Sequence, residues 1–289
     1  MIQSLVRPAG LNDHQQLSNL IFFETHLHRH LDWRSPLEWL GAPFYWALEE
    51  GRHITAALAC PTEAVGIAWV RLFVYSGHWS PDHAWNLLWP TAKAEIARSG
   101  GATVAAIAIQ PWFQQLLAAN GFENRQQIVM LDWRYQPWAE READGIHIRK
   151  MSASDLPDVE KTDRASFHPL WQNPLETLER AYGQALFGTV AENGNGIMGY
   201  QLTTGSSGQR AHLARLAVHP EVQGHGVGKA LLIDLFSKLV RNGITRLSVN
   251  TQSDNNVSLS LYQKMGFVRT GEQYPVYTFE VPATLQEEA

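Results

Sequence analysis

The sequence has one cysteine, no long apolar run and no basic excess, and each of these features excludes a class of protein. Cys60 has no second cysteine to pair with, so an intramolecular disulfide is excluded and a reducing, cytoplasmic location is expected. No apolar stretch approaches about 18 residues, and the N-terminus has no signal pattern, so no membrane span is expected. The net charge of −5 predicts no general attraction to nucleic acid or anionic membranes.

What is present is the composition of a folded protein with an internal repeat. Hydrophobic residues make up 45% of 289 residues, enough for two packed domains. Three landmarks recur in the same order, namely Val6-Arg7 with Asp13 and Ile148-Arg149 with Asp155 (142 residues apart), Leu72-Phe73-Val74 and Leu216-Ala217-Val218 (144 apart), and Asn120-Gly121-Phe122 and Met265-Gly266-Phe267 (145 apart). This predicts a tandem duplication, with domains at 1–133 and 145–289 and a polar linker at 134–144.

The second copy has the clearer pattern of secondary structure. Helices are expected over 155–166, 174–184, from Lys229 to Asn242-Gly243, and over 256–265. Strands are expected at 146–149, 186–192, 197–204, 211–218, 246–251 and 274–281. The order predicts an α/β fold with a mixed sheet, whose two central strands are parallel because a helix crosses between them.

A glycine-rich turn, Gln223-Gly224-His225-Gly226-Val227-Gly228, lies between one of these central strands and the helix after it. Backbone N–H groups at a helix start attract phosphate oxygens, and glycines let the backbone approach them closely. Two common phosphate loops fit poorly. A dinucleotide-binding turn needs its third glycine one position later, and a P-loop needs Ser or Thr where Ala230 stands.

Two motifs together resemble the GNAT acyltransferase superfamily. Leu216-Ala217-Val218-His219-Pro220 followed by Gln223-x-x-Gly226-x-Gly228 is similar to its acyl-CoA pyrophosphate motif. Asn255-x-x-Ser258-x-x-Leu261-Tyr262-x-x-x-Gly266-Phe267 is similar to the second half of the signature. The resemblance covers 145–289 and implies an N-acetyltransferase that uses acetyl-CoA as co-substrate, without a metal.

The resemblance also implies roles for single residues. Backbone at Leu216 and Val218 would bond the pantetheine arm, and Tyr262 would be the general acid, since a phenol of pKa about 10 can protonate a departing thiolate. The acyl-CoA contacts it implies are Leu216, Ala217, Val218, Gln223, Gly224, His225, Gly226, Val227, Gly228, Lys229, Asn250, Asn255, Ser258 and Tyr262.

The general base is open. Many relatives have a glutamate where this sequence has Asn250, and an amide cannot accept the proton of the amine. His212 is the first candidate, although a histidine on a strand can also simply lie at a solvated position or cover the face of the sheet. Asp163, Glu176 and His168, or a water chain, are the alternatives.

The first copy keeps the landmarks of the repeat but lacks the residues of the acyl-CoA motif. At an offset of 144, Gln223, Gly226 and Gly228 correspond to Trp79, Asp82 and Ala84, so this half is expected to be a degenerate GNAT-like domain whose tryptophans serve core packing. The His26-Leu27-His28-Arg29-His30 tract is interpreted as a solvated helix end rather than a metal site.

The expected partner is the primary amine of a small molecule or of a peptide N-terminus, with no nucleic acid and no membrane. Direct transfer in a ternary complex is preferred, and both a monomer and a homodimer are compatible with the sequence. The alternative is a catalytically silent acyl-CoA sensor or interaction module.

Overall fold

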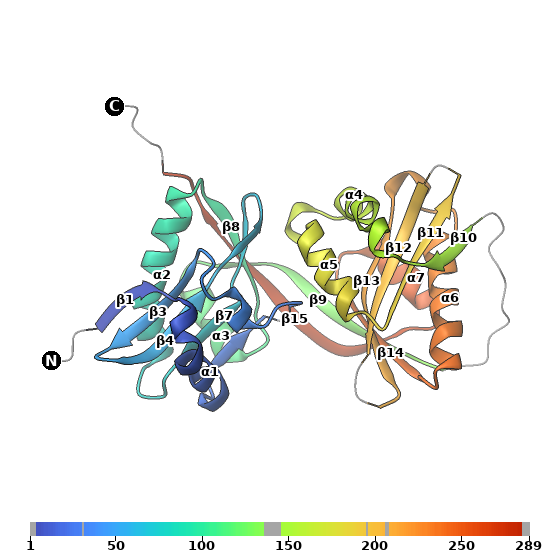
Figure 1. Ribbon diagram of the computed structural model, residues 1–289. Helices are drawn as coiled ribbons and strands as arrows, with labels where there is room; N and C mark the ends of the chain where they lie inside the picture. Colours follow the sequence, from blue (N-terminus) through green and yellow to red (C-terminus); the bar gives the residue numbers. More distant parts are fainter. Residues whose placement is uncertain (1–3, 31, 136–145, 195, 206–207, 285–289) are drawn as a thin grey trace, which may run out of the picture. The chain divides into compact units, whose positions relative to one another are not determined.

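The computed structural model describes residues 4–30, 32–135, 146–194, 196–205 and 208–284, and it has the expected α/β architecture (Figure 1). It divides into two compact units. Unit 1 comprises Met1–Gln126 and Tyr274–Ala289, and unit 2 comprises Gln127–Gln273. Within the described residues, no helix is both long and apolar enough to cross a membrane.

Unit 2 is one mixed sheet with helices on its faces. Its strand order is β10-β11-β12-β13-β14-β9-β15; the β13–β14 pair is parallel, and the other pairs from β10 to β9 are antiparallel. Its elements are β10 (His147–Lys150), α4 (Leu156–Ser166), α5 (Leu175–Gln184), β11 (Phe187–Asn193), β12 (Gly196–Gly205), β13 (Arg210–Val218), α6 (Val227–Arg241), β14 (Arg246–Gln252), α7 (Asn256–Lys264) and parts of β9 (Glu123–Arg134) and β15 (Val268–Val281). The expected elements are present within two residues of their bounds, except that the last strand starts at Val268 rather than Tyr274.

The core of unit 2 lies between the sheet and α6. Leu232, Leu235, Phe236 and Leu239 from α6 pack against apolar side chains of β13, β14 and β9. Helix α4 contacts β12 and β13, and α5 contacts β12. The periodic apolar residues of α6 therefore form a buried stripe, as their spacing predicts.

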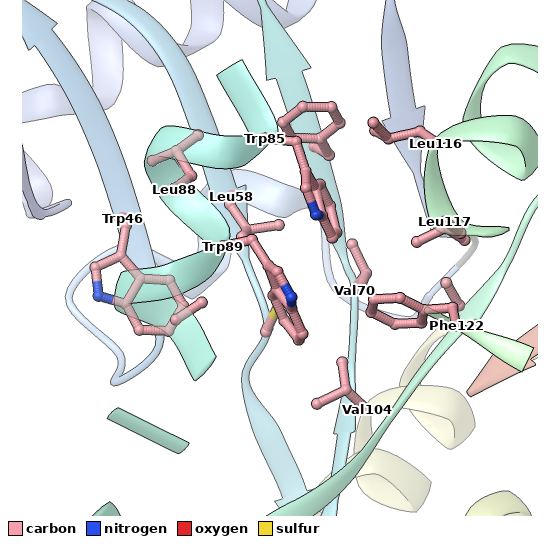
Figure 2. Packing of buried hydrophobic residues seen from close by; sticks show 14 of the residues in the cluster. Trp46, Leu58, Val70, Trp85, Leu88, Trp89, Val104, Leu116, Leu117 and Phe122 are labelled. Carbon is pink, nitrogen blue, oxygen red and sulfur yellow. The ribbon is translucent and has the colours of Figure 1, made fainter. Parts of the chain in front are cut away.

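Unit 1 holds two sheets, ordered β1-β3-β4-β7-β2 and β15-β8-β6-β5. Its elements are β1 (Ser4–Pro8), α1 (His14–Phe23), β2 (Leu27–Arg29), β3 (Tyr45–Glu50), β4 (His53–Ala59), β5 (Thr62–Ala64), β6 (Ile67–Trp69), β7 (Leu72–Tyr75), α2 (Pro81–Arg98), β8 (Ala102–Ile107) and α3 (Pro111–Ala119), with the last part of β15. Figure 2 shows that tryptophans fill its core: Trp46, Trp85 and Trp89 are buried, and the last two stack with ring centroids 5.3 Å apart. Most of the tryptophans in this half therefore serve core packing.

Each unit is completed by a strand from the other half of the sequence. Residues 128–134 of β9 pair antiparallel with β14, and residues 276–281 of β15 pair antiparallel with β8. Each exchanged strand covers an edge that would otherwise present unpaired backbone groups. The compact units therefore do not follow the sequence boundary expected near Trp133, which falls inside β9; the expected linker lies outside the described residues from 136 onwards.

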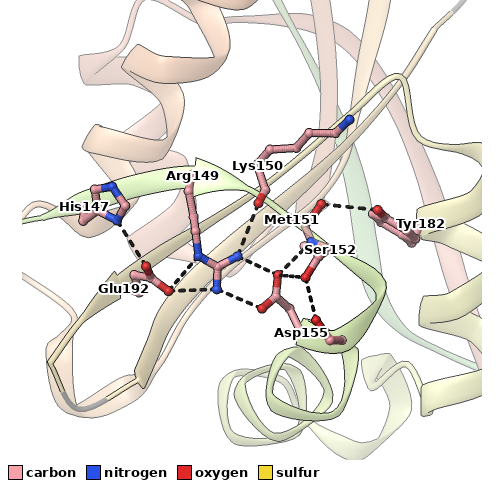
Figure 3. Close-up of polar contacts among 9 residues, drawn as sticks. His147, Arg149, Lys150, Met151, Ser152, Asp155, Tyr182 and Glu192 are labelled. Carbon is pink, nitrogen blue, oxygen red and sulfur yellow. Dashed lines mark hydrogen bonds and ion pairs between the residues drawn. The ribbon is translucent and has the colours of Figure 1, made fainter.

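The internal repeat is visible in its contacts. In unit 2, Arg149 forms an ion pair with Asp155 at 2.7 Å and a second with Glu192 at 2.8 Å (Figure 3). In unit 1, Arg7 contacts Asp13 at 2.8 Å and also bonds a glutamate on the third strand. The bonds from Arg149, together with the Ser152 backbone N–H, hold the pKa of Asp155 well below its usual range.

The histidine tract is not a helix end. Leu27–Arg29 form the short strand β2, which pairs antiparallel with β7. His28 is 3% exposed and stacks on Phe113, with ring centroids 4.0 Å apart. The expectation of a solvated helix was wrong because a three-residue strand is defined by its partner strand and not by local spacing.

Candidate functional site

Strands β13 and β14 pair with each other only over their first four residues and then separate. They pair in parallel only over Arg210–Leu213 and Arg246–Val249. In the ladder with β12, Leu202 pairs with Arg215 and Thr203 with Leu213, so Ala214 is an extra, bulged residue. A bulge bends its strand and ends regular pairing. From Leu216 onwards, β13 therefore pairs with β12 alone among the described strands.

Backbone groups of Leu216 and Val218 face the open side of β13. His219 N–H donates to the Met198 carbonyl, so by alternation residues 217 and 219 point toward β12 and residues 216 and 218 point away. The Val218 carbonyl accepts instead from Ser166 Oγ at 3.0 Å and from Gln223 Nε2 at 3.0 Å. Both donors are side chains, which can rotate away for a ligand.

The helix after this strand begins without a side-chain cap. The N-cap of α6 is Gly226, with φ 87° and ψ 0°, and no side chain bonds its first amides. Only glycine adopts this left-handed conformation at low cost, and a Cβ built there would meet open space. Unpaired N–H groups and the positive end of the helix dipole therefore face a site suited to an anion.

The open strand edge and the uncapped helix line one cleft of 690 Å³. Its lining residues are Ser166, Phe167, Leu216, Ala217, Val218, Val222, Gln223, Gly224, Gly226, Val227, Gly228, Lys229, Asn255, Val257, Ser258, Ser260, Leu261, Lys264 and Met265. Among them are two lysines and no carboxylate, so the lining is basic although the chain as a whole is acidic. An extended, polyanionic ligand with an amide-bearing arm fits this combination.

The comparison with known families decides what this cleft belongs to. Residues 156–267 match the model of the acetyltransferase (GNAT) family, and this segment holds all the residues that line the cleft. Residues 156–267 are a GNAT-family domain. Members of this family take their acyl group from acyl-CoA.

Solved structures extend the likeness of fold to the whole chain. A GCN5-related N-acetyltransferase from Sphaerobacter thermophilus is 14% identical, with 98% of this chain and 97% of that chain covered and a TM-score of 0.63. A tandem GNAT protein from the clavulanic acid biosynthesis pathway is 17% identical, with 98% and 100% covered and a TM-score of 0.65. A probable N-acyltransferase from Enterococcus faecalis is 11% identical, with 97% and 73% covered and a TM-score of 0.73. Both halves therefore share the GNAT fold.

Eleven of the fourteen residues expected at the acyl-CoA site line the cleft, and three do not. Those that do are Leu216, Ala217, Val218, Gln223, Gly224, Gly226, Val227, Gly228, Lys229, Asn255 and Ser258. The side chain of Asn255 caps α7, where its Oδ1 accepts from the Ser258 N–H at 3.1 Å. Its Nδ2 group, which lies 3.3 Å from Thr251 Oγ1, is the part that can turn toward a ligand.

The other three, His225, Asn250 and Tyr262, lie outside the lining, and so does the base candidate His212. His225 is exposed, with Nδ1 3.0 Å from the Gln223 carbonyl. Asn250 is exposed on β14. Nδ1 of His212 is 2.9 Å from Ser248 Oγ, and burial lowers the pKa of this histidine. Tyr262 is 4% exposed with its ring 5.2 Å from that of Phe267, and burial raises its pKa well above the usual value, so its phenol stays protonated.

The structure adds a lysine that the sequence motifs did not indicate. Lys264, in the last turn of α7, lines the cleft together with Val257, Ser260 and Leu261. These positions are seven, four and three residues before it, so they share one helix face. Extending this face from the recognised motif residues would have found it.

A buried ion pair stands behind the open strand. Arg215 on β13 donates to both carboxylate oxygens of Asp163 on α4, at 2.7 and 2.8 Å, and to the Trp171 carbonyl at 2.6 Å. The Tyr200 hydroxyl donates to the same carboxylate, and its pKa is raised well above the usual value by burial and by Asp163. Asp163 is fully buried, and its oxygens are used by these donors and by the Asn173 N–H at 2.8 Å, so it is not free to act as a general base.

The remaining base candidates are also placed away from the cleft. Glu176 is on α5, with a side chain 66% exposed, and the His168 ring accepts from the Leu170 N–H at 3.4 Å. Neither lines the cleft. The described residues contain no group of three or more side chains that could together hold a metal ion.

Proposed function

We propose that the protein is an acetyl-CoA-dependent N-acetyltransferase that acts on the primary amine of a small molecule or of a peptide N-terminus. One observation supports this proposal above all: the uncapped N-terminus of α6 and the open edge of β13 line the same basic cleft. The pyrophosphate would lie at the α6 amides, and the pantetheine amides would bond the backbone groups of Leu216 and Val218 that point away from β12. Ser166 and Gln223 would then release the Val218 carbonyl.

Transfer is direct. The amine nitrogen attacks the thioester carbonyl carbon, the C–N bond forms, and the C–S bond breaks with its electron pair leaving on sulfur. A backbone N–H on β13 stabilises the developing oxyanion, and one such donor in a water-excluded site contributes about 3 kcal/mol. The buried Cys60 lies in unit 1, and burial raises its thiol pKa, which makes it a poor covalent carrier of the acyl group.

Tyr262→Phe tests the proposed general acid. We expect kcat to fall about 100-fold, because proton transfer to the leaving thiolate typically contributes 10²- to 10⁴-fold. Affinity for acetyl-CoA should stay unchanged, since the cleft is lined by other residues. Because burial raises the pKa of Tyr262, its ionisation should not limit the rate below pH 10. Steady-state kinetics with a binding titration check this, and an unchanged kcat would remove Tyr262 from the mechanism.

The lining contains neither a carboxylate nor an imidazole. We therefore favour solvent as the acceptor of the amine proton, with His212 as the alternative. His212→Ala should leave the rate and its pH profile unchanged if solvent is the acceptor, whereas a loss of the acidic limb would assign the role to His212.

Lys264→Met tests the basic side of the cleft. We expect the Kd for acetyl-CoA to rise about fivefold at low salt, because one charge-assisted phosphate contact is lost, and the salt dependence of binding to become shallower. Lys238→Met is the matched control, since Lys238 is on α6, pairs with Asp234 and does not line the cleft. Equal titrations for both variants would place the phosphates elsewhere.

The function itself is tested by acetyl-CoA-dependent release of free CoA thiol over a panel of amines. The panel holds polyamines, aminoglycosides, amino acids, amino sugars and peptides with free N-termini. Release with one class establishes the transferase and its acceptor class. Saturable binding of acetyl-CoA without release from any amine would instead favour an acyl-CoA sensor, and absence of binding would refute both.

A further inference from the structure

Unit 1 contains the strand and helix that correspond to β13 and α6. In the β-ladders, Val74 pairs with Ala57 and Ala217 pairs with Tyr200, which places β7 and the end of β13 at an offset of 143 residues. The helix C-caps Ser99 and Asn242 are separated by the same 143 residues. The stretch from strand to helix end therefore has equal length in both units.

At this offset the glycine turn is replaced by a turn of helix. Gly226 corresponds to His83 and Gly228 to Trp85, not to Asp82 and Ala84 as the uniform offset of 144 indicated. Helix α2 begins at Pro81, and its cap Ser80 accepts from the His83 N–H at 3.2 Å. Proline at the first position and serine at the cap are strong helix-start signals. The amides that are free at α6 are thus partly engaged at α2.

The open edge of the strand is also taken. Phe73 and Tyr75 correspond to Leu216 and Val218, whose backbone groups face the acyl-CoA cleft. In unit 1 the short strand β2 lies on this side of β7, with His28 opposite Phe73. His30 N–H donates to the Arg71 carbonyl at 3.0 Å, which continues the same ladder. Strand β2 therefore occupies the place that the pantetheine arm takes in unit 2 under the proposed function.

Aromatic rings fill the remaining space. Trp85, at the position of Gly228, is fully buried and meets the Phe73 ring edge-on at 5.1 Å. His28 stacks on Phe113, and its Nε2 lies 3.0 Å from the Val70 carbonyl. Burial lowers the pKa of His28 to about 4, so the ring is neutral at physiological pH. The space that the glycines leave open in unit 2 is therefore filled by packed aromatic side chains in unit 1.

We propose that unit 1 is closed to acyl-CoA by its own chain, with β2 as an internal substitute for the pantetheine arm, so that each chain binds a single acyl-CoA. This inference uses the proposed function only for the identity of the ligand. It also gives β2 a role: it satisfies the backbone groups that the divergence of β7 and β8 would leave unpaired in a buried place.

The test combines binding stoichiometry with hydrogen exchange on the full chain. Wild type should bind one acetyl-CoA per chain by native mass spectrometry, and Gly226→Asp, which blocks only the unit 2 site, should bind none. Exchange at residues 27–29 and 72–74 should be slow and unchanged by acetyl-CoA, while exchange in the 216–229 segment should slow down. The His28 ring needs no charge for this arrangement, so one pH is sufficient.

Two acetyl-CoA molecules per chain, or one retained by Gly226→Asp, would overturn the inference. So would faster exchange at β2 on adding acetyl-CoA, because the ligand would then have displaced the strand. If wild type binds no acetyl-CoA, the proposed function fails, but hydrogen exchange of residues 27–29 without ligand still tests the closure of unit 1. Slow exchange there supports a closed unit 1, and rapid exchange overturns it.

Discussion

Gly226→Asp is expected to weaken acetyl-CoA binding about 1000-fold, which is roughly 4 kcal/mol. Aspartate is a favoured helix cap, so its carboxylate should accept from the first amides of α6 and occupy the phosphate position with a charge of the same sign. The left-handed φ of 87° adds a backbone cost for any residue with a Cβ. Isothermal titration with acetyl-CoA measures the loss.

Gly243→Asp is the matched control for this prediction. Gly243 also has a positive φ, of 69°, and open space around its Cβ position, but it follows the other end of α6. The control therefore carries the same charge change and a similar backbone strain without touching the cleft. Gly226→Ser, which copies the Ser80 cap of α2 without a charge, should fall between the two. Equal affinity of Gly226→Asp and Gly243→Asp would show that the phosphates do not bind at α6.

The second half of the fold was predictable because its signals are local. The glycines at 224 and 226 adopt positive φ, Asn255 caps α7 with its side chain, and Asn242-Gly243 ends α6 as expected. Each of these residues has a conformational reason to stand where it does, independent of distant parts of the chain. The strand exchange had no such signal, because the pairing of residues 128–134 with β14 joins segments more than 100 residues apart and no local pattern marks it.

The first half was harder to predict from the sequence, because its elements also depend on contacts between distant residues. Strand β2 exists only through its pairing with β7, and α2 starts before the position that a uniform repeat offset gives. The offset changes from 142 at the Arg7 network to 145 at the α3 and α7 caps, so one-to-one equivalences from a single offset misplace residues. Ladder register corrects this, and it is visible only in three dimensions.

Asp163→Asn is expected to lower the free energy of unfolding of unit 2 by about 3–5 kcal/mol, the usual cost of leaving one buried charge without its partner. The change removes the negative charge that Arg215 and Tyr200 share and leaves the positive charge of Arg215, whose side chain is 13% exposed and whose guanidinium lies over the Phe167 ring. Sequence alone gave no warning of this, since the partner of Arg215 is 52 residues earlier and no local pattern links the two. Urea unfolding, followed by hydrogen exchange of β12 and β13, measures the loss.

Two further variants test whether loss of the buried Asp163–Arg215 ion pair causes the loss of stability. Arg164→Met removes an exposed ion pair with Glu160 on the same helix and should leave stability nearly unchanged, because solvent screens that pair. Asp163→Asn combined with Arg215→Met should cost less than the two single changes together, since the second change removes the charge that the first left unpaired. Because Arg215 also holds the Trp171 carbonyl, and Ser166 and Phe167 line the cleft, the single variant should weaken acetyl-CoA binding as well. Strict additivity would show that Asp163 and Arg215 stabilise the unit separately, and that the open edge of β13 does not depend on their contact.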